Sequence, residues 1–167
     1  LGLDSAAYDA LASRVNGIIH GAANVNFTQA IDDARRINVD GTRNVLDFAA
    51  HAKAHGGLDR MEHISTAYVA GKRPGPIRES DLESGQRFNN TYEQTKYEAE
   101  LLVRERWNDL PICVVRPSIV VGDSKSGYTS SFKVMYFPLK ILAGGYVWVI
   151  PADRDGRVDL VPVDYVV

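Results

Sequence analysis

The stretch GIIHGAA (residues 17–23) places a short apolar run directly before three small residues. A second short run, ICVV (residues 112–115), is also apolar at every position. Strands that are apolar at successive positions are typical of a parallel sheet that helices cover on both faces. The small residues Gly21–Ala23 give a ligand close access to the backbone after the first of these strands.

Longer segments with helical spacing alternate with these runs. Residues 31–54 carry apolar or small side chains three and four apart, and Gly56-Gly57 ends that helix. Asn90 stands three residues before Glu93, which is typical of a capped first turn, and we expect this helix to continue to about Trp107. The alternation of strands and helices predicts an α/β fold with a mainly parallel sheet.

The other expected elements are shorter. They are a helix over 6–15, strands over 61–66, 112–116 and 158–161, loops over 70–90 and 117–128, and a helix over 130–143 that Pro138 breaks or kinks. Residues 134–152 are nearly all apolar, but the longest uncharged part, 141–152, is shorter than the roughly 20 residues of a membrane span. We expect a buried or pocket-lining helix there, followed by a strand, rather than a membrane-surface segment.

Composition limits the classes of function. The chain has 167 residues, of which 45% are apolar and 24% charged, as in an ordinary globular domain, and its net charge of −2 gives no reason to expect a nucleic-acid partner. The single cysteine, Cys113, is expected to be a buried strand residue in a reducing compartment, and with no signal peptide at the start the expected location is the cytoplasm. The four histidines lack carboxylates at ligand spacing, so no metal site is expected.

The most informative local feature is the sequence from Tyr92 to Lys96. Residues four apart share a helix face, so the phenol and the ammonium point the same way. A phenol with a pKa near 10 is a poor acid, and a neighbouring cation lowers that pKa. The pair is therefore a candidate general acid, although Tyr and Lys are also common on helix surfaces.

Two further polar residues support this site. Thr66 ends a predicted strand, and ligands of parallel sheets bind at the carboxyl ends of the strands. The alternative is that its hydroxyl caps its own loop. Asn38 is a poor helix former inside a predicted helix, so we expect its amide to have a specific partner, the alternative being a solvent-facing side chain.

In order and spacing, these features resemble an extended short-chain dehydrogenase/reductase. The segments that carry the resemblance are Gly21–Ala23, Asn38–Thr42, Ser65–Gly71 (STAYVAG), the pair Tyr92 and Lys96, and Arg116–Gly122. Within that superfamily, HGAANVNF (20–27), FNNTYEQTK (88–96) and RPSIVVGD (116–123) look most like the male-sterility branch, which contains fatty acyl-CoA reductases and thioester-reductase domains.

The resemblance implies a Rossmann-type, doubly wound parallel sheet. Because no GxGxxG follows a strand, we expect a partial sheet lacking its first βαβ unit. Residues 1–167 are then the C-terminal part of one NAD(P)-binding domain, with the substrate-binding region starting at about 123–167.

The resemblance also implies residue roles in reducing an acyl thioester, bound to coenzyme A or a carrier, to an aldehyde or alcohol. Tyr92 would be the proton donor, Lys96 would lower its pKa and hold the nicotinamide ribose, and Thr66 would bond the reacting oxygen. Asn38 would order a relay water. The expected cofactor is NADP, with NAD as the alternative, and the residues expected along it are Ala22, Ala23, Tyr92, Lys96, Pro117, Ile119 and Val120.

Two other functions stay open. A sugar-nucleotide epimerase or dehydratase, or a hydroxysteroid-type dehydrogenase, would use the same Thr66, Tyr92 and Lys96, whereas a non-catalytic dinucleotide-binding fragment would not need a proton donor. The apolar content of 123–150 favours an acyl chain. Tyr128, Phe132, Tyr136 and Phe137 could line an acyl channel or form plain core. Arg35-Arg36 and Lys72-Arg73 could meet a cofactor phosphate, but solvated surface is favoured.

Overall fold

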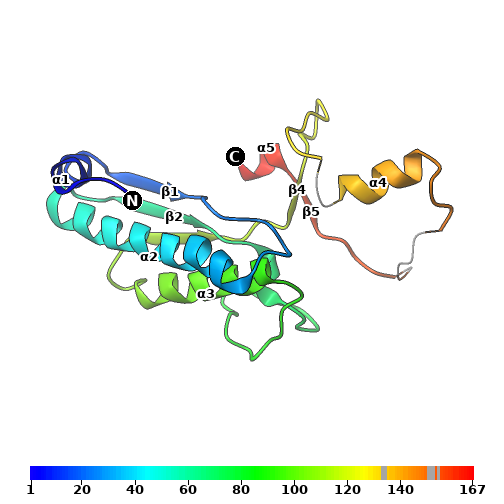
Figure 1. Cartoon of the computed structure of the whole chain (residues 1–167), viewed down its shortest axis with the longest axis horizontal. Helices are drawn as coiled ribbons and strands as arrows, with labels where there is room; N and C mark the ends of the chain where they lie inside the picture. Colours follow the sequence, from blue (N-terminus) through cyan, green and yellow to red (C-terminus); the bar gives the residue numbers. More distant parts are fainter. Residues whose placement is uncertain (133–134, 150–152, 154) are drawn as a thin grey trace. The chain divides into compact units, whose positions relative to one another are not determined.

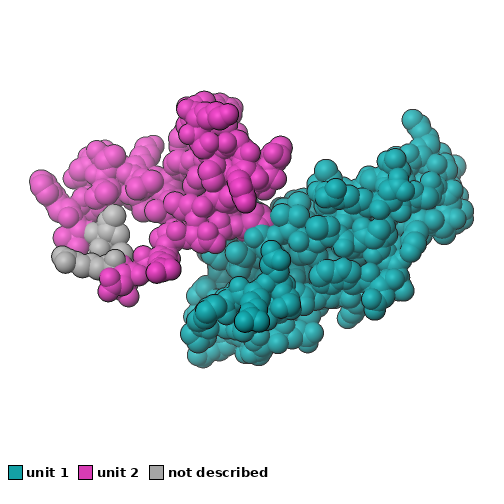
Figure 2. Space-filling model, turned by 180° about the vertical axis from the view of Figure 1, so that it is seen from behind, with its two compact units in different colours: residues 1–116 teal, residues 117–167 magenta. Residues whose placement is uncertain are grey.

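A computed structural model describes residues 1–132, 135–149, 153 and 155–167. The chain forms two compact units, residues 1–116 and residues 117–167 (Figure 2). The first unit carries the parallel sheet that the apolar runs predict, together with the long helices. The second unit begins at Pro117 and holds shorter elements.

Three strands form the sheet of the first unit. They are β1 (Gly17–His20), β2 (Arg60–Ile64) and β3 (Ile112–Val115), in the order β1-β2-β3, and both pairings are parallel. In register, Ile18 lies beside Met61, and Met61 lies beside Ile112. The predicted parallel α/β arrangement is confirmed, and β1 is an edge of the sheet in the described chain.

Two long helices, α2 (Ile31–His55) and α3 (Thr91–Glu105), cover one face of this sheet (Figure 1). The core between them and the strands contains Leu46, Ala49, Met61, Val103 and Ile112. The short helix α1 (Ser5–Ala12) packs on α2. The hydrophobic spacing of residues 31–54 predicts α2 correctly, and the cap at Asn90 predicts where α3 begins.

The other face of the sheet carries Ile19, which is 75% exposed, the half-buried Glu62 and the exposed Cys113. The prediction that Cys113 is buried is wrong. Side chains alternate along a strand, so Ile112 points to the helices and Cys113 points away from them. In the described residues of this unit the long helices cover one face, and not both faces as the apolar runs predict.

Helix α3 has the predicted cap. The Oδ1 atom of Asn90 accepts a hydrogen bond from the backbone N–H of Glu93 at 2.9 Å. The carboxylate of Glu93 in turn accepts one from the backbone N–H of Asn89 at 2.8 Å. These bonds satisfy amides that the first helical turn leaves without partners, which fixes where α3 begins.

The second unit differs from the prediction at several points. Its elements are β4 (Ile119–Val121), α4 (Tyr136–Ala143), β5 (Leu160–Pro162) and α5 (Val163–Val166), and β4 pairs in parallel with β5. The expected loop over 117–128 therefore contains a strand, because the β-branched run Ile119–Val121 finds a partner far along the chain. No helix in the described part of the chain combines the length and apolar character that crossing a bilayer requires.

Helix α4 starts later than predicted and is not buried. It begins at Tyr136, so Pro138 lies in its first turn, where the missing N–H leaves no bond unmade. Residues 133–134 and 150–152, which the predictions include, lie outside the described residues. None of the residues of α4 is buried, and residues 146–149 are exposed and form no strand.

Candidate active site

One face of α3 presents four polar side chains at intervals of four residues. They are Tyr92, Lys96, Glu100 and Arg104. Lys96 is buried, and its Nζ atom donates a hydrogen bond to the backbone oxygen of Ile64, the last residue of β2, at 2.7 Å. The stripe therefore meets the carboxyl end of the central strand, where parallel sheets bind ligands.

Tyr92 meets Thr66, which directly follows Ser65 at the end of β2. Burial raises the pKa of Tyr92, and a hydrogen bond to the Thr66 side chain opposes that rise. The Thr66 hydroxyl also accepts a hydrogen bond from the backbone N–H of Tyr68 at 3.3 Å, as the cap of the short 3-10 helix η1 (Ala67–Ala70). The Thr66 hydroxyl therefore caps its own loop and also contacts Tyr92.

The pKa of Tyr92 moves in the direction opposite to the predicted one. Lys96, whose ammonium donates to Ile64 at the end of β2, is not among the causes of its shift. Burial lowers the pKa of Lys96 itself to about 8, and the negative charge of Glu100 opposes this fall. In this state the phenol is held protonated, as a proton donor requires.

Asn38 is buried and has the specific partners that its place in a helix predicts. Its Oδ1 atom accepts a hydrogen bond from the backbone N–H of Asn24 at 2.7 Å, and its Nδ2 atom donates to Thr95 Oγ1 at 2.9 Å. The solvent-facing alternative is wrong, since Asn38 is 2% exposed. Asn38 thereby ties the loop after β1 to the residue beside Lys96, while its role toward a relay water stays a prediction.

Two buried histidines lie close to Lys96 and were not predicted as part of the site. His63 on β2 is fully buried, and neither of its ring nitrogens has a hydrogen-bond partner. Its ring centroid lies 5.4 Å from that of His20 on β1. Burial and the charge of Lys96 lower the pKa of His63 to about 3, so this imidazole is neutral at physiological pH.

The loop after β1 has the small residues that a nucleotide needs. Ala22 is exposed and Ala23 half-buried. A Cβ atom added at Gly21 would meet the Ile64 side chain at 3.7 Å, an ordinary contact, so this position tolerates a slightly larger residue. The contact of Tyr92 and Lys96 with a ribose stays a prediction.

The remaining cofactor predictions fall in the second unit. Pro117 and Ile119 are half-buried there, and Val120 is exposed. Their contact with a cofactor stays a prediction.

Most of the basic side chains considered as phosphate ligands have acidic partners. Arg35 forms a two-pronged pair with Glu98 at 2.8 and 2.7 Å, and Arg36 pairs with Asp33 at 2.9 Å. Arg73 pairs with Asp81 at 3.1 Å. These contacts favour the surface interpretation over phosphate binding.

The aromatic residues of the second unit form a hollow rather than a core. It has a volume of about 620 Å³ and is lined by Phe132, Tyr136, Phe137, Leu139, Lys140 and Ala143. Phe132 is 72% exposed and Phe137 is 65% exposed, so the plain-core interpretation is wrong. Tyr128 is also exposed but does not line this hollow.

Comparison with known proteins gives the family. The model of the family described as Male sterility protein matches residues 1–167, which is the whole chain. The chain belongs to the male sterility protein family. This confirms the resemblance carried by the motifs after β1, around Tyr92 and at Arg116–Asp123.

Curated relatives of this family member include fatty acyl-CoA reductases. The chain is 27% identical over 98% of its length to fatty acyl-CoA reductase wat of Drosophila melanogaster, of which it covers 37%. It is 32% identical over 95% of its length to fatty acyl-CoA reductase 1 of Xenopus laevis, of which it covers 36%. The chain thus spans little more than a third of the length of these relatives.

A solved structure extends the likeness to three dimensions. The terminal R domain from the myxalamid PKS-NRPS biosynthetic pathway superposes with a TM-score of 0.84 and 34% identity, over 99% of this chain and 41% of that one. The partial Rossmann-type fold expected of this male sterility family member is confirmed.

Proposed function

We propose that this chain is part of an NAD(P)H-dependent reductase that converts an acyl thioester, bound to coenzyme A or to a carrier, into an aldehyde or alcohol. The observation that carries the proposal is the Tyr92 hydroxyl bonded to Thr66 beside Lys96, at the carboxyl end of β2. Membership of the male sterility family and the names of the relatives support it.

The chemistry follows from where these groups lie. When bound, the nicotinamide cofactor supplies a hydride to the acyl carbon. As negative charge develops on the acyl oxygen, the hydroxyls of Thr66 and Tyr92 donate hydrogen bonds to it, and Tyr92 Oη transfers its proton. Loss of the thiol then gives the aldehyde, so one reduced cofactor and one proton yield one aldehyde and one free thiol. A second hydride and proton give the alcohol.

Lys96 serves this chemistry through its ammonium group, whose remaining N–H groups orient the ribose. Ala22 and Ala23 leave space along the cofactor, and Pro117, Ile119 and Val120 complete its contacts. We further propose NADP as the cofactor, with NAD as the alternative, and residues 123–167 as the start of the substrate region.

The hollow in the second unit supports an acyl substrate over a sugar nucleotide. Its lining is mainly aromatic and aliphatic, and its volume lies within the range of small-molecule sites. An alkyl chain gains free energy from such a lining in proportion to the apolar area that leaves water. A sugar nucleotide brings hydroxyl and phosphate groups that these side chains cannot bond.

The experiment compares two substrates and uses the whole protein that contains this chain. Oxidation of NADPH is followed at the nicotinamide absorbance band with palmitoyl-CoA and, separately, with UDP-glucose, and the free thiol released is titrated in parallel. We expect oxidation with palmitoyl-CoA, matched by thiol release. Turnover of UDP-glucose without thiol release would instead support the epimerase alternative.

A further inference from the structure

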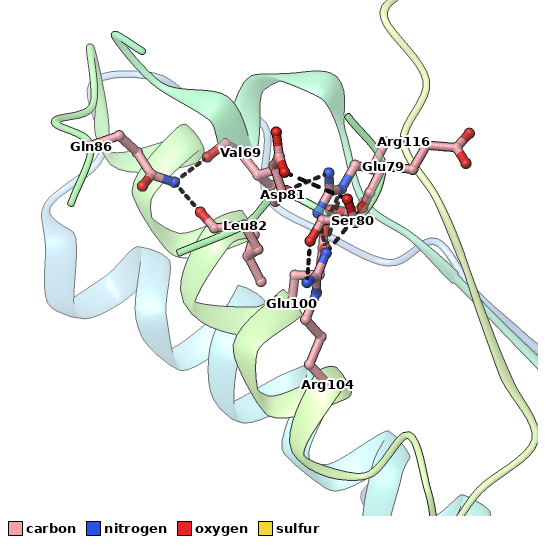
Figure 3. A network of polar contacts seen from close by, with 10 residues as sticks. Val69, Glu79, Ser80, Asp81, Leu82, Gln86, Glu100, Arg104 and Arg116 are labelled. Carbon is pink, nitrogen blue, oxygen red and sulfur yellow. Dashed lines mark hydrogen bonds and ion pairs between the residues drawn. The ribbon is translucent and has the colours of Figure 1, made fainter. Parts of the chain in front are cut away.

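Glu100 lies one helical turn beyond Lys96 on α3 and is fully buried, with 0% of its surface exposed. A buried carboxylate is costly unless charged and polar partners surround it. Arg116 supplies such partners, because its Nε atom donates to Glu100 Oε1 at 3.1 Å and to Oε2 at 3.0 Å (Figure 3). Ser65 donates its hydroxyl to Glu100 Oε2 at 2.6 Å.

The two arginines beside Glu100 also hold the loop over residues 79–81. Arg116 Nη1 donates to the backbone oxygen of Asp81 at 2.9 Å. Arg104 donates to the backbone oxygen of Ser80 at 2.9 Å and to that of Glu79 at 3.1 Å, and its Nε lies 3.5 Å from Glu100 (Figure 3). Glu100 therefore accepts hydrogen bonds from Ser65 and Arg116 and forms an ion pair with Arg104, in a network that joins α3, the residue after β2 and this loop.

This network touches the candidate active site through Ser65. The Ser65 hydroxyl is fixed by Glu100, and its backbone N–H donates to the oxygen of Val115 at 2.7 Å. Thr66 is the next residue, and its hydroxyl meets Tyr92. The position of the Thr66 hydroxyl thus depends on a peptide that Glu100 anchors.

Glu100 also places a negative charge one helical turn from Lys96. The titratable groups that face Lys96 from other elements are His63 on β2 and His20 on β1, both buried imidazoles whose pKa values are lowered by burial and by the charge of Lys96. Glu100 is the carboxylate that acts on it from α3. Neutral imidazoles add no negative charge, so the carboxylate is the feature that favours the charged form of Lys96.

We propose that Glu100 is a positioning residue of the Tyr92 and Lys96 site, which holds the Thr66 hydroxyl against Tyr92 through Ser65 and places a buried negative charge one helical turn from Lys96. The proposal rests on the proposed function, since it assigns Glu100 to the same reaction. A purely structural role would need only the ion pair with Arg116. It would predict a change in stability with no change in the titration of Lys96.

The test replaces Glu100 by Gln in the whole protein. The amide keeps the shape and one oxygen acceptor but removes the charge. Steady-state rates with NADPH and palmitoyl-CoA are measured from about pH 6 to about pH 10. We expect the alkaline fall in kcat, where Lys96 loses its proton, to move down by about one pH unit. We expect kcat at its plateau to fall about tenfold, with KM values within about twofold of the original.

Three companion variants separate the two parts of the proposal. Glu100→Asp keeps the charge, so the alkaline limb stays near its original pH even if kcat falls. Ser65→Ala breaks the hydrogen bond to Glu100 but keeps the negative charge of Glu100. We therefore expect kcat to fall, while the pH of its alkaline fall stays the same. Glu98→Gln is the control, because it removes a carboxylate two residues away that pairs with Arg35 instead. We expect that variant to keep the original kcat and the original pH of the alkaline fall in kcat.

A readout without turnover distinguishes failure of this proposal from failure of the proposed function. The protein is labelled with 13C at lysine Cε, the Lys96 signal is assigned with Lys96→Arg, and its titration is followed by NMR. A Lys96 pKa that is lower in Glu100→Gln than in the original supports the proposal even if palmitoyl-CoA is not a substrate. An unchanged Lys96 titration, or an equal shift in Glu98→Gln, overturns it. If Glu100→Gln does not fold, the other two variants still test the proposal. It is overturned if the alkaline fall in kcat moves in Glu100→Asp, or if kcat is unchanged in Ser65→Ala.

Discussion

Tyr92 combines the two properties of a proton donor, since burial keeps its phenol protonated and its hydroxyl meets Thr66. In the whole protein, Tyr92→Phe should reduce kcat by about 10² or more, the usual scale for loss of a general acid, with little change in NADPH affinity. Steady-state kinetics and a fluorescence titration with NADPH measure the two quantities. Tyr97→Phe is the control, because Tyr97 lies on the same helix and packs on Phe88 with ring centroids 5.1 Å apart. A kcat that survives in Tyr92→Phe would remove Tyr92 from the reaction.

His63 makes the stability of the fold depend on pH. Its pKa is about 3 in the folded chain, against about 6.5 when exposed. The unfolded chain therefore binds a proton that the folded chain does not, and stability that is present above pH 6.5 is lost as the pH falls toward 3. The loss attributable to this residue is at most about 1.4 kcal/mol for each pH unit.

Urea unfolding midpoints at several pH values test this dependence. His63→Gln should flatten the fall in stability between about pH 6 and about pH 4. His55→Gln serves as control because His55 is exposed near the end of α2. An equally steep fall in His63→Gln would show that other groups account for it.

Tyr92, Lys96, Thr66 and Asn38 could be found from sequence because each breaks a local rule or repeats a helical spacing. Glu100 and His63 could not. A glutamate on a helix is ordinarily solvated, and only the packing of Arg116 and Ser65 around it makes it a buried group. Likewise, a histidine in a strand gives no sign that both of its ring nitrogens are without partners.

Among the elements, α3 carries the site, and its first turn depends on Asn90. Asn90→Ala removes the bond to the N–H of Glu93, so we expect a loss of about 1 kcal/mol in the free energy of unfolding. The lost cap also frees the turn that holds Tyr92, so kcat should fall with it. Thermal unfolding by circular dichroism, together with kcat, measures both effects.

The control for the cap is Asn44→Ala, an exposed asparagine inside α2 that caps nothing. Alanine favours a helix interior over asparagine, so this variant should be at least as stable as the original. Equal losses in the two variants would show that Asn90 does not act as a cap.

The elements of the first unit could be predicted because their signals are local. The apolar runs, the helical spacing of α2 and the cap of α3 each lie within one segment. The second unit depends on distant partners instead. Strand β4 forms only because Ile119–Val121 pairs with Leu160–Pro162, and the apolar sequence of α4 cannot show that its side chains surround a hollow rather than fill a core.

At the scale of the whole molecule, the proposed site covers only part of a nucleotide. We propose that residues around β1, β2 and α3 contact the nicotinamide and its ribose. The phosphate groups need a glycine-rich loop at a helix N-terminus, where backbone N–H groups and the helix dipole bind the anion. The sequence contains no such loop after a strand. Most of the affinity for NADPH is therefore expected to come from outside these 167 residues.

The last prediction compares the 167-residue chain alone with the whole protein that carries it. Calorimetric titration with NADPH should show binding to the chain at least about 100-fold weaker, because loss of the phosphate contacts costs several charge-assisted hydrogen bonds. The chain alone should also associate, since β1 is an edge strand in the described residues and its residue Ile19 is 75% exposed. Light scattering measures this, and Ile19→Lys should reduce it without changing the fold. A monodisperse chain that binds NADPH as tightly as the whole protein would show that the residues around Tyr92 and Lys96 suffice for the nucleotide, and that the phosphate groups find their partners within this chain.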